Sequence, residues 1–432
     1  MEIEELYEIY RQHPVITTDS RDCPEGSIFL ALKGESFDGN KFAASALDKG
    51  CAYAVVDEAE YADTSDKRYI LVEDCLATFK ALARHHRRQF DIPVIGITGT
   101  NGKTTTKELV AAVLGEKYNV LFTQGNFNND VGVPKTLFRL SPEHDIAVVE
   151  MGASHPGDIK TLVETVEPAY GIITNVGKAH LQGFGSFEGV VRTKGELYDY
   201  LRNNPSSKVF IDAGNEHLMR IADGLHLIKY GVGEQDGLNV RGEVVECAQF
   251  LHFRWTDGES WYDVNTHLIG SYNIYNMLAA ATIGLHFGIT PQAICHALSS
   301  YEPSNNRSQL TNTAHNHLIV DAYNANPTSM SAALRNFRDM QVSPKMAILG
   351  DMRELGESSA EEHQKVVDFL SDAHLDNTWL VGEAFGKTTT SLRKFADIDA
   401  VKAAIAEEQP RGYYILIKGS NGIKLYQLPE IL

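Results

Sequence analysis

The sequence lacks the marks of several classes of protein. Its five cysteines are scattered and show no Cys-x-x-Cys spacing, which favours reduced thiols over a disulfide framework or a zinc site. No apolar run approaches the about 18 residues that a membrane helix needs, and the acidic, amphipathic start does not resemble a signal peptide. Basic residues are scarce as well: 39 Lys and Arg against 57 Asp and Glu give a net charge of −18, which argues against nonspecific binding to nucleic acid. We expect a cytoplasmic protein with no membrane insertion and no nucleic-acid partner.

The composition is that of a soluble α/β protein with several domains. A length of 432 residues with 43% hydrophobic content predicts about three domains, each with its own core. We place them at residues 1–90, a small α/β domain; 91–306, a doubly wound parallel sheet; and 307–432, a Rossmann-like α/β domain. The segment 303–306 is the expected hinge between the second and third domains.

The domain assignment depends on strands that alternate with helices. Strands are predicted at 27–32, 52–56, 69–72, 92–97, 146–150, 170–175, 318–321, 346–349, 379–381 and 414–417. Helices are predicted at 41–49, 76–90 and 187–201, and residues 238–268 alternate as an antiparallel extension would. Strands that alternate with helices in this way are typical of parallel sheets.

A glycine-rich segment, Thr98–Glu108 (TGTNGKTTTKE), stands between an apolar β-branched run and a helical stretch. This order aims backbone N–H groups and a helix N-terminus at phosphates. Lys103 would then reach the β- and γ-phosphates of a nucleotide, and the Thr104 hydroxyl would bind Mg²⁺. Gly99 lies only three residues before Gly102, so the loop is tighter than the general P-loop; the alternative is a chance glycine-rich turn.

Three further residues are candidate metal ligands or reactive groups beside this loop. Glu150 ends a predicted parallel strand, the place of a Mg²⁺ ligand beside a phosphate loop, although a solvated strand-end carboxylate is the alternative. His180 follows the next strand, where a structural role is equally open. Lys194 falls on the apolar stripe of its helix. It either snorkels to the edge or reacts, with a lowered pKa, with CO₂ to give a carbamate ligand.

Other segments suggest nucleotide and ligand contacts. Asn273 and Asn276 lie one helical turn apart and suit a base edge, with helix capping as the alternative. The segment 321–327 (DAYNANP) follows a strand and resembles a ligand-binding loop, with an ordinary Asx turn as the alternative. Residues 382–388 (GEAFGKT) look like a second phosphate loop, but no neighbouring strand supplies a metal-type carboxylate, so we interpret them as a plain strand-to-helix loop.

Together these segments resemble the Mur ligase family of ATP-dependent amide-forming enzymes of peptidoglycan precursor synthesis. The matching pieces are TDSR (18–21), TGTNGKTTTKE (98–108), GNFNNDVGVP (125–134), EMGASHPGDI (150–159), TNVGKAHL (174–181) and TKGEL (193–197). DAYNANPTSM (321–330) and LGDMRELG (349–356) are similar to the member that adds D-alanyl-D-alanine to UDP-N-acetylmuramoyl-tripeptide. The resemblance implies an N-terminal domain for the nucleotide-sugar peptide, a central ATPase domain and a C-terminal ligase domain.

The resemblance also implies roles for individual residues. ATP would be bound by Thr98, Gly99, Thr100, Asn101, Gly102, Lys103, Thr104, Thr105, Asn273, Asn276, Arg307, Asp321 and Tyr323. Two Mg²⁺ ions would be held by Thr104, Glu150, His180 and carbamylated Lys194, and the catalytic residues would be Lys103, Lys194 and His180. The two substrates would be bound by Ser20, Arg21, Lys33, Asp38, Asn40, Asn128, Asn129, Asn324, Asn326 and Lys418.

Two positions depart from the family's pattern. Tyr272 stands where the family commonly has His before the first adenine-site Asn, and Asn421 stands where it often has a basic residue after Lys-Gly-Ser. The second departure leaves the dipeptide carboxylate without one expected cation, a role that Lys418 would take.

Several functions stay open from the sequence. The alternatives are the sister ligase that adds the third amino acid, a folylpolyglutamate-type ligase, and a non-catalytic relative that binds nucleotide sugars. The presence of all five of Lys103, Thr104, Glu150, His180 and Lys194 argues against the last. We expect a monomer; the third residue of the tripeptide, diaminopimelate or lysine, is not encoded in any motif that we find.

Overall fold

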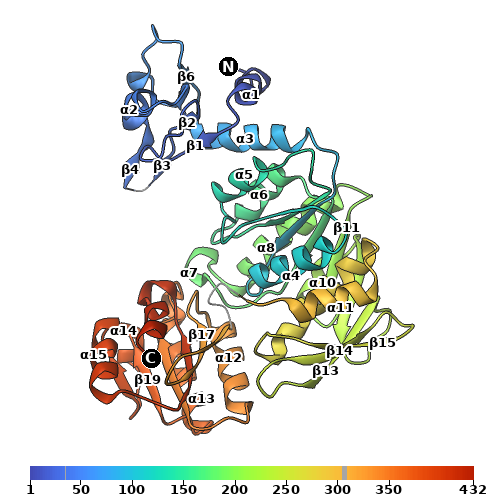
Figure 1. Cartoon of the computed structure of the whole chain (residues 1–432), viewed down its shortest axis with the longest axis vertical. Helices are drawn as coiled ribbons and strands as arrows, with labels where there is room; N and C mark the ends of the chain where they lie inside the picture. Colours follow the sequence, from blue (N-terminus) through green and yellow to red (C-terminus); the bar gives the residue numbers. More distant parts are fainter. Residues whose placement is uncertain (35, 304–308) are drawn as a thin grey trace.

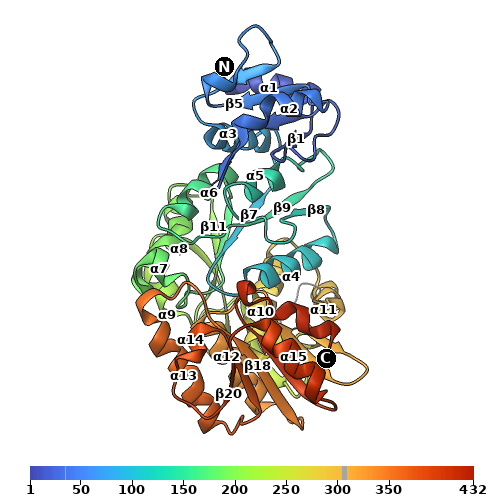
Figure 2. The ribbon, with the colours of Figure 1, turned by 90° about the vertical axis from the view of Figure 1, so that its left-hand side faces the viewer.

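The computed structural model describes residues 1–34, 36–303 and 309–432, which fold into three α/β units. The N-terminal and C-terminal units lie at opposite ends of the molecule, with the central unit between them (Figure 1, Figure 2). The predicted fold class, three α/β domains with parallel sheets, is confirmed. The boundaries 1–90, 91–306 and 307–432 stay a prediction.

The N-terminal unit is a small parallel sheet of order β1-β2-β5-β6. Its strands are β1 (Ile16–Thr17), β2 (Ile28–Leu30), β5 (Tyr53–Val56) and β6 (Tyr69–Leu71), with the hairpin β3 (Lys33–Gly34) and β4 (Phe37–Asp38) beside it. Its helices are α1 (Ile3–Gln12), α2 (Ala43–Asp48) and α3 (Cys75–Arg87). Helix α3 joins this unit to the central one, where Phe79 stacks on Phe138 and both Arg84 and Arg88 pair with Glu167.

The central unit is a nine-stranded sheet of order β15-β14-β13-β12-β11-β10-β7-β9-β8. Its strands are β7 (Val94–Thr98), β8 (Val120–Phe122), β9 (Ile146–Glu150), β10 (Tyr170–Ile173), β11 (Lys208–Asp212), β12 (His226–Val232), β13 (Val240–Glu246), β14 (His252–Thr256) and β15 (Trp261–Asn265). In this order, the neighbouring strands from β8 to β13 pair in parallel, and β14 pairs antiparallel with both β13 and β15. The predicted antiparallel extension therefore continues the same sheet.

Helices cover both faces of this sheet, as in a doubly wound fold. They are α4 (Lys103–Gly115), α5 (Gly132–Leu137), α6 (Asp158–Val166), α7 (Leu181–Phe184), α8 (Phe187–Arg202), α9 (Glu216–Ile221), α10 (Ile274–His286) and α11 (Pro291–Ser300). One core lies under α4, α10 and α11, and the other lies under α5, α6 and α8. Because both faces are covered, β7 and β9 are buried along their whole length, which explains their continuous apolar sequences.

The C-terminal unit is a six-stranded sheet of order β16-β17-β21-β18-β19-β20. Its strands are β16 (Gln309–Asn312), β17 (His317–Asp321), β18 (Lys345–Gly350), β19 (Thr378–Val381), β20 (Arg393–Phe395) and β21 (Tyr414–Lys418); only β16 is antiparallel. Its helices are α12 (Pro327–Asp339), α13 (Ser359–Asp372), α14 (Glu383–Gly386) and α15 (Ile398–Glu408). In the described part of the chain, no helix is long and apolar enough to cross a membrane.

Phe210 on β11 tests the packing of the central core. Its side chain is fully buried and lies against Tyr170 and His286. Phe210→Ala removes a large buried ring, so we expect a loss of about 3–5 kcal/mol in the unfolding free energy, measured on the central-domain transition by denaturant titration. Val245→Ala, at a side chain 49% exposed, is the matched control, with a change within about 0.5 kcal/mol. Equal stabilities of the two variants would contradict this packing.

Candidate active site

The phosphate loop lies between β7 and α4, and two glycines permit its tight shape. Gly99 and Gly102 have φ of +143° and +77°. A Cβ on Gly99 would lie 2.0 Å from Thr174 Oγ1, and one on Gly102 would lie 2.6 Å from Asn276 Oδ1. The chain therefore needs glycine at both positions, whatever the spacing of the general P-loop. Helix α4 begins at Lys103, directly after the loop, so its N-terminal amides face the same space.

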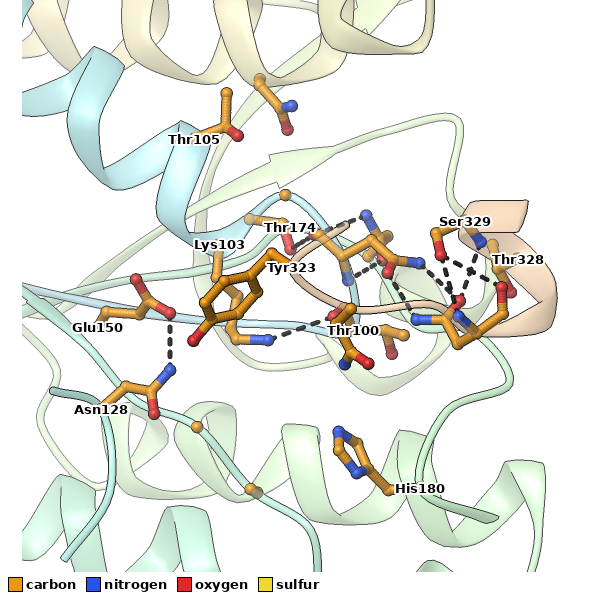
Figure 3. Close-up of a pocket in the computed structure, with 18 of the residues that line it drawn as sticks. Thr100, Lys103, Thr105, Asn128, Glu150, Thr174, His180, Tyr323, Thr328 and Ser329 are labelled. Atoms are coloured by element: carbon orange, nitrogen blue, oxygen red, sulfur yellow. Dashed lines mark hydrogen bonds between the residues drawn. The ribbon is translucent and has the colours of Figure 1, made fainter. Parts of the chain in front are cut away.

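The loop that follows β10 fixes this conformation. Thr174 Oγ1 donates to the Asn101 carbonyl at 2.6 Å, and the Asn175 side chain both donates to that carbonyl and accepts from the Asn101 amide, each at 3.0 Å. Lys103 Nζ folds back to the carbonyls of Gly99 and Thr100, at 2.9 and 3.2 Å. The ammonium group is thus held inside the loop, where phosphate oxygens would lie (Figure 3).

A cavity of about 730 Å³ opens in front of the loop, between the central and C-terminal units. Most of the predicted site residues line it: Thr100, Asn101, Gly102, Lys103, Thr105, Asn128, Asn129, Glu150, His180, Asn273, Asn276, Asp321, Tyr323, Asn324, Asn326 and Lys418. Tyr323, from the C-terminal unit, lines the same cavity as Lys103 and Glu150 and is drawn with them in Figure 3. Residues from segments more than 200 positions apart therefore face one space.

The other predicted residues lie elsewhere. Thr98, Gly99, Thr104 and Lys194 do not line the cavity itself; Thr98, Thr104 and Lys194 are buried. Ser20, Arg21, Lys33, Asp38 and Asn40 belong to the N-terminal unit and do not line this cavity. Arg307 falls outside the described residues.

Glu150 is buried, and both of its carboxylate oxygens lie against polar groups of the protein. Its side chain is 1% exposed, so it is not a solvated strand-end carboxylate. Oε1 accepts from Asn128 Nδ2 at 2.8 Å and from Thr104 Oγ1 at 3.2 Å, while Oε2 has no hydrogen bond and lies 3.9 Å from Lys107 Nζ. A carboxylate oxygen beside a hydroxyl fits Mg²⁺, which takes one or two carboxylates and completes its shell with phosphate oxygens and water. In residues 1–34, 36–303 and 309–432, no three His, Cys, Asp or Glu side chains form a ready-made metal cluster.

Lys194 is a buried basic group, and His180 is a half-buried one. Lys194 on α8 is 2% exposed, so it does not snorkel to the solvent; its Nζ donates to the Ala153 carbonyl at 3.3 Å and lies 5.3 Å from the Phe184 ring centroid. Burial, with Lys103 nearby, holds its pKa well below the ordinary value. Burial also lowers the pKa of His180, against the opposing effect of Glu354. Both groups are therefore shifted towards their neutral forms.

The two asparagines proposed for the base bind each other and do not cap the helix. Asn276 Nδ2 donates to Asn273 Oδ1 at 2.8 Å, and Asn273 Nδ2 donates to the Ile269 carbonyl at 2.8 Å. Thr106 Oγ1, on the phosphate-loop helix, donates to Asn276 Oδ1 at 3.1 Å. This network connects the start of α10 to α4, directly beside the phosphate loop.

The C-terminal segment brings its own partners. Lys418 is buried, and its ammonium group pairs with Asp321. Asn326 caps α12 through Ser329 and donates through Nδ2 to Asn101 Oδ1 at 2.8 Å. Lys418 is the cation that we expect to replace the family's basic residue at position 421. In this structure its ammonium group already pairs with Asp321 at the wall of the cavity.

The N-terminal residues that were predicted to bind substrate contact acidic neighbours. Lys33 pairs with Asp57 and Glu58, and Asn40 Nδ2 donates to Asp38 and Asp57 at 2.9 and 2.8 Å. Arg21 pairs with Asp19 in the same way, and it is exposed. A substrate bound here would exchange these contacts for its own.

The second glycine-rich loop, Gly382–Thr388, has its amides occupied. Asp351 accepts from the backbone N–H of Ala384 and of Phe385, each at 2.9 Å, where a phosphate would otherwise bind. A carboxylate at the start of a helix takes the place of an anion. This contact agrees with the interpretation of a plain strand-to-helix loop.

Sequence reasoning missed two residues with clear chemistry: Asp212, which lines the cavity, and Lys107, which is buried behind it. Asp212 ends β11 and lines the cavity, and burial raises its pKa. Its position at the carboxyl end of a parallel strand is the signal that identified Glu150, and the same rule finds it. Lys107 is fully buried one turn after Lys103 and donates to the Gly125 carbonyl at 3.2 Å; its local sequence carries no comparable signal.

A phosphate loop, a buried carboxylate beside it and a cavity shared with a second α/β unit are typical of a nucleotide-binding enzyme. Three segments match known protein families: residues 14–87 match "Mur ligase family, catalytic domain", 97–284 "Mur ligase middle domain" and 306–421 "Mur ligase, glutamate ligase domain". The chain is 34% identical over 427 residues to the UDP-N-acetylmuramoyl-tripeptide--D-alanyl-D-alanine ligase of Escherichia coli, covering 96% of this chain and 93% of that one. The chain belongs to the Mur ligase family.

Solved structures agree with this assignment. MurF from Acinetobacter baumannii superimposes with a TM-score of 0.87 at 32% identity, covering 96% of this chain and 92% of that one. The MurF ligase of Thermotoga maritima in complex with ADP gives a TM-score of 0.86 at 25% identity, with 96% of each chain covered. The predicted family is confirmed.

Proposed function

We propose that this chain joins D-alanyl-D-alanine to UDP-N-acetylmuramoyl-tripeptide and converts ATP to ADP and phosphate, in the synthesis of peptidoglycan precursors. The observation that carries the proposal is the match along 96% of the chain to the Escherichia coli ligase of that name. The phosphate loop, Glu150 and Lys194 supply the chemistry that such a reaction needs. A cytoplasmic location and a monomeric state belong to the same proposal.

The reaction has to overcome repulsion between two anions. The tripeptide carboxylate attacks the γ-phosphorus of ATP, ADP leaves, and an acyl phosphate forms. The amine of D-alanyl-D-alanine then attacks the acyl carbon and loses a proton, and the tetrahedral intermediate collapses with release of phosphate. Lys103 and the amides at the start of α4 bind the phosphate oxygens and stabilise the charge that moves during the transfer.

Magnesium ions would be held by Thr104 and Glu150, with His180 and a carbamate on Lys194 at a second position. When bound, Mg²⁺ supplies positive charge that offsets the repulsion between the phosphates and the carboxylate. The protein's own contribution is the fixed orientation of Glu150, whose Oε1 is held by Asn128 and Thr104 and whose Oε2 lies 3.9 Å from the Lys107 ammonium group.

The carbamate on Lys194 would form from the neutral amine and CO₂, with release of one proton. The lowered pKa supports this step because only the neutral amine reacts. The product is an anion on a helix that packs beside the cavity, close to Lys103. A buried carbamate would thus have a cation to pair with.

The nucleotide and the two substrates would occupy different parts of the molecule. Asn273 and Asn276 would face the adenine, and Asp321, Tyr323 and Arg307 would reach ATP from the third domain. Asn128, Asn129, Asn324 and Asn326 would line the channel for the peptide, while the N-terminal residues hold the uridine diphosphate end. Lys418 would bind the dipeptide carboxylate after exchange of its contact with Asp321.

The requirement for the dipeptide separates this proposal from its rivals. With the tripeptide nucleotide and ATP, we expect phosphate release only when D-alanyl-D-alanine is present, because its amine is the attacking group. A coupled phosphate assay measures this, with diaminopimelate, lysine, D-alanine and glutamate as the alternative amines. Phosphate release with a single amino acid, when UDP-N-acetylmuramoyl-dipeptide replaces the tripeptide nucleotide, would favour the sister ligase. Phosphate release with glutamate would favour a folylpolyglutamate-type enzyme.

A further inference from the structure

The loops after β10 and after β18 meet across the boundary between the central and C-terminal units. His180 Nδ1 contacts Glu354 Oε2 there. The backbone N–H of Gln182 donates to the carbonyl of Glu354 at 3.2 Å, so backbone and side chain bind the same two segments. The contact joins a residue of the candidate active site to a residue that has no assigned role.

Both members of this pair have an unusual backbone. His180 and Glu354 have φ of +50° and +62°, in the left-handed region that non-glycine residues seldom adopt. Such conformations persist when the surroundings hold them, and they gather at functional sites. Here two of them, from two different units, face each other through their side chains. This coincidence indicates a built contact rather than an accidental one.

Neighbouring contacts hold the same segment to the C-terminal unit. Lys178 Nζ pairs with Glu362 Oε1 at 2.8 Å, and the Glu362 side chain is 8% exposed. The Lys178 backbone N–H donates to Thr328 Oγ1 at 3.2 Å. The C-terminal unit therefore contacts this segment on both sides of His180, through Lys178 and through Gln182. The position of the His180 ring thus depends on where the C-terminal unit lies.

The carboxylate decides which ring nitrogen carries the proton. Nδ1 is the nitrogen that faces Glu354, and a carboxylate oxygen accepts hydrogen bonds, so we expect the proton on Nδ1. Nε2 then keeps its lone pair for the cavity that His180 lines. Carboxylates orient metal-binding histidines in this way, and their loss typically lowers affinity or activity 10–100-fold.

We propose that Glu354 is a positioning residue that fixes the tautomer and orientation of His180 only when the C-terminal unit is docked, so that docking completes the site. The role of His180 in the reaction rests on the proposed function, whereas the pairing of His180 with Glu354 does not. Glu354 lies in the segment LGDMRELG (349–356), to which the proposed reaction assigns no other role.

The test uses Glu354→Asn, because asparagine tolerates a left-handed backbone and its side chain is too short to reach the ring. We expect kcat to fall about 10–100-fold while the Kd of ADP, measured by calorimetry, stays near that of the wild type. Glu354→Gln keeps an acceptor oxygen of the same reach and should recover most of the activity. Glu357→Asn, at an exposed acid two residues after Leu355, is the control and should be unchanged.

A second readout needs no substrate. Proton–nitrogen correlation spectra of the ¹⁵N-histidine-labelled full chain report the tautomer of His180, assigned with a His180→Asn variant. We expect the Nδ1-protonated form in the wild type and its loss in Glu354→Asn. A wild-type spectrum with Nε2 protonated, or an unchanged kcat in Glu354→Asn, would overturn the inference. The predicted tautomer in a protein that does not ligate would instead contradict the proposed function alone.

Discussion

Replacing Lys103 by alanine is expected to lower kcat at least about a hundredfold, the usual cost of losing one preorganised charge contact in a transition state, about 3–4 kcal/mol. The structure explains why no other lysine takes over. Lys103 Nζ is anchored inside the loop by the carbonyls of Gly99 and Thr100. Lys418, which also lines the cavity, is engaged by Asp321.

The measurement is steady-state ADP formation at saturating ATP, tripeptide nucleotide and D-alanyl-D-alanine. Lys117→Ala, two residues after the end of α4, is the matched control and should keep full activity, because its ammonium group contacts the carbonyls of Phe287 and Gly288 and the ring of Tyr118 and does not line the cavity. An active Lys103→Ala protein would remove the physical basis of the phosphate site.

Replacing Lys194 by alanine should leave almost no activity, and acetate or formate should restore part of it. The residue is 2% exposed and lies on α8 against Phe184, so its truncation leaves space at a buried position that a small carboxylate could enter. If a carbamate is the working group, an added carboxylate supplies its anionic oxygens there. The expected result is a rate that rises with acetate concentration and saturates.

The control separates rescue from a salt effect. Sodium chloride at the same ionic strength should give no recovery, and Lys160→Ala, at an exposed position on α6, should neither lose activity nor respond to acetate. Normal activity in Lys194→Ala would show that the amine only fills space. Loss without any rescue would favour a role for the amine itself.

Local sequence predicted the fold well where burial dictates it. The strand at 146–150 has the predicted bounds, because a parallel strand covered on both faces must be apolar throughout. The strand–loop–helix unit of Thr98–Glu108 is present as well, since glycine positions and a helix start are local features. The short β16 and β20 were not foreseen, because their few residues carry no distinctive pattern.

Side-chain partners were harder to predict than positions. Lys418 pairs with Asp321 from a distant part of the chain, and His180 contacts Glu354 across a domain boundary. Such choices depend on how the units pack, which no local pattern encodes. The placement of Lys194 on a buried stripe was predictable from helical spacing, whereas its distance from solvent was not.

The most direct test of the account is the mass of the product. The purified full chain is incubated with ATP, Mg²⁺, D-alanyl-D-alanine and the tripeptide nucleotide that carries either diaminopimelate or lysine. We predict a new species whose mass is that of the tripeptide nucleotide plus the dipeptide minus one water, formed in equal amount with ADP, and the preferred tripeptide identifies the third residue. An unchanged tripeptide nucleotide under conditions where ATP is consumed, or a product that carries a single added amino acid, would contradict it.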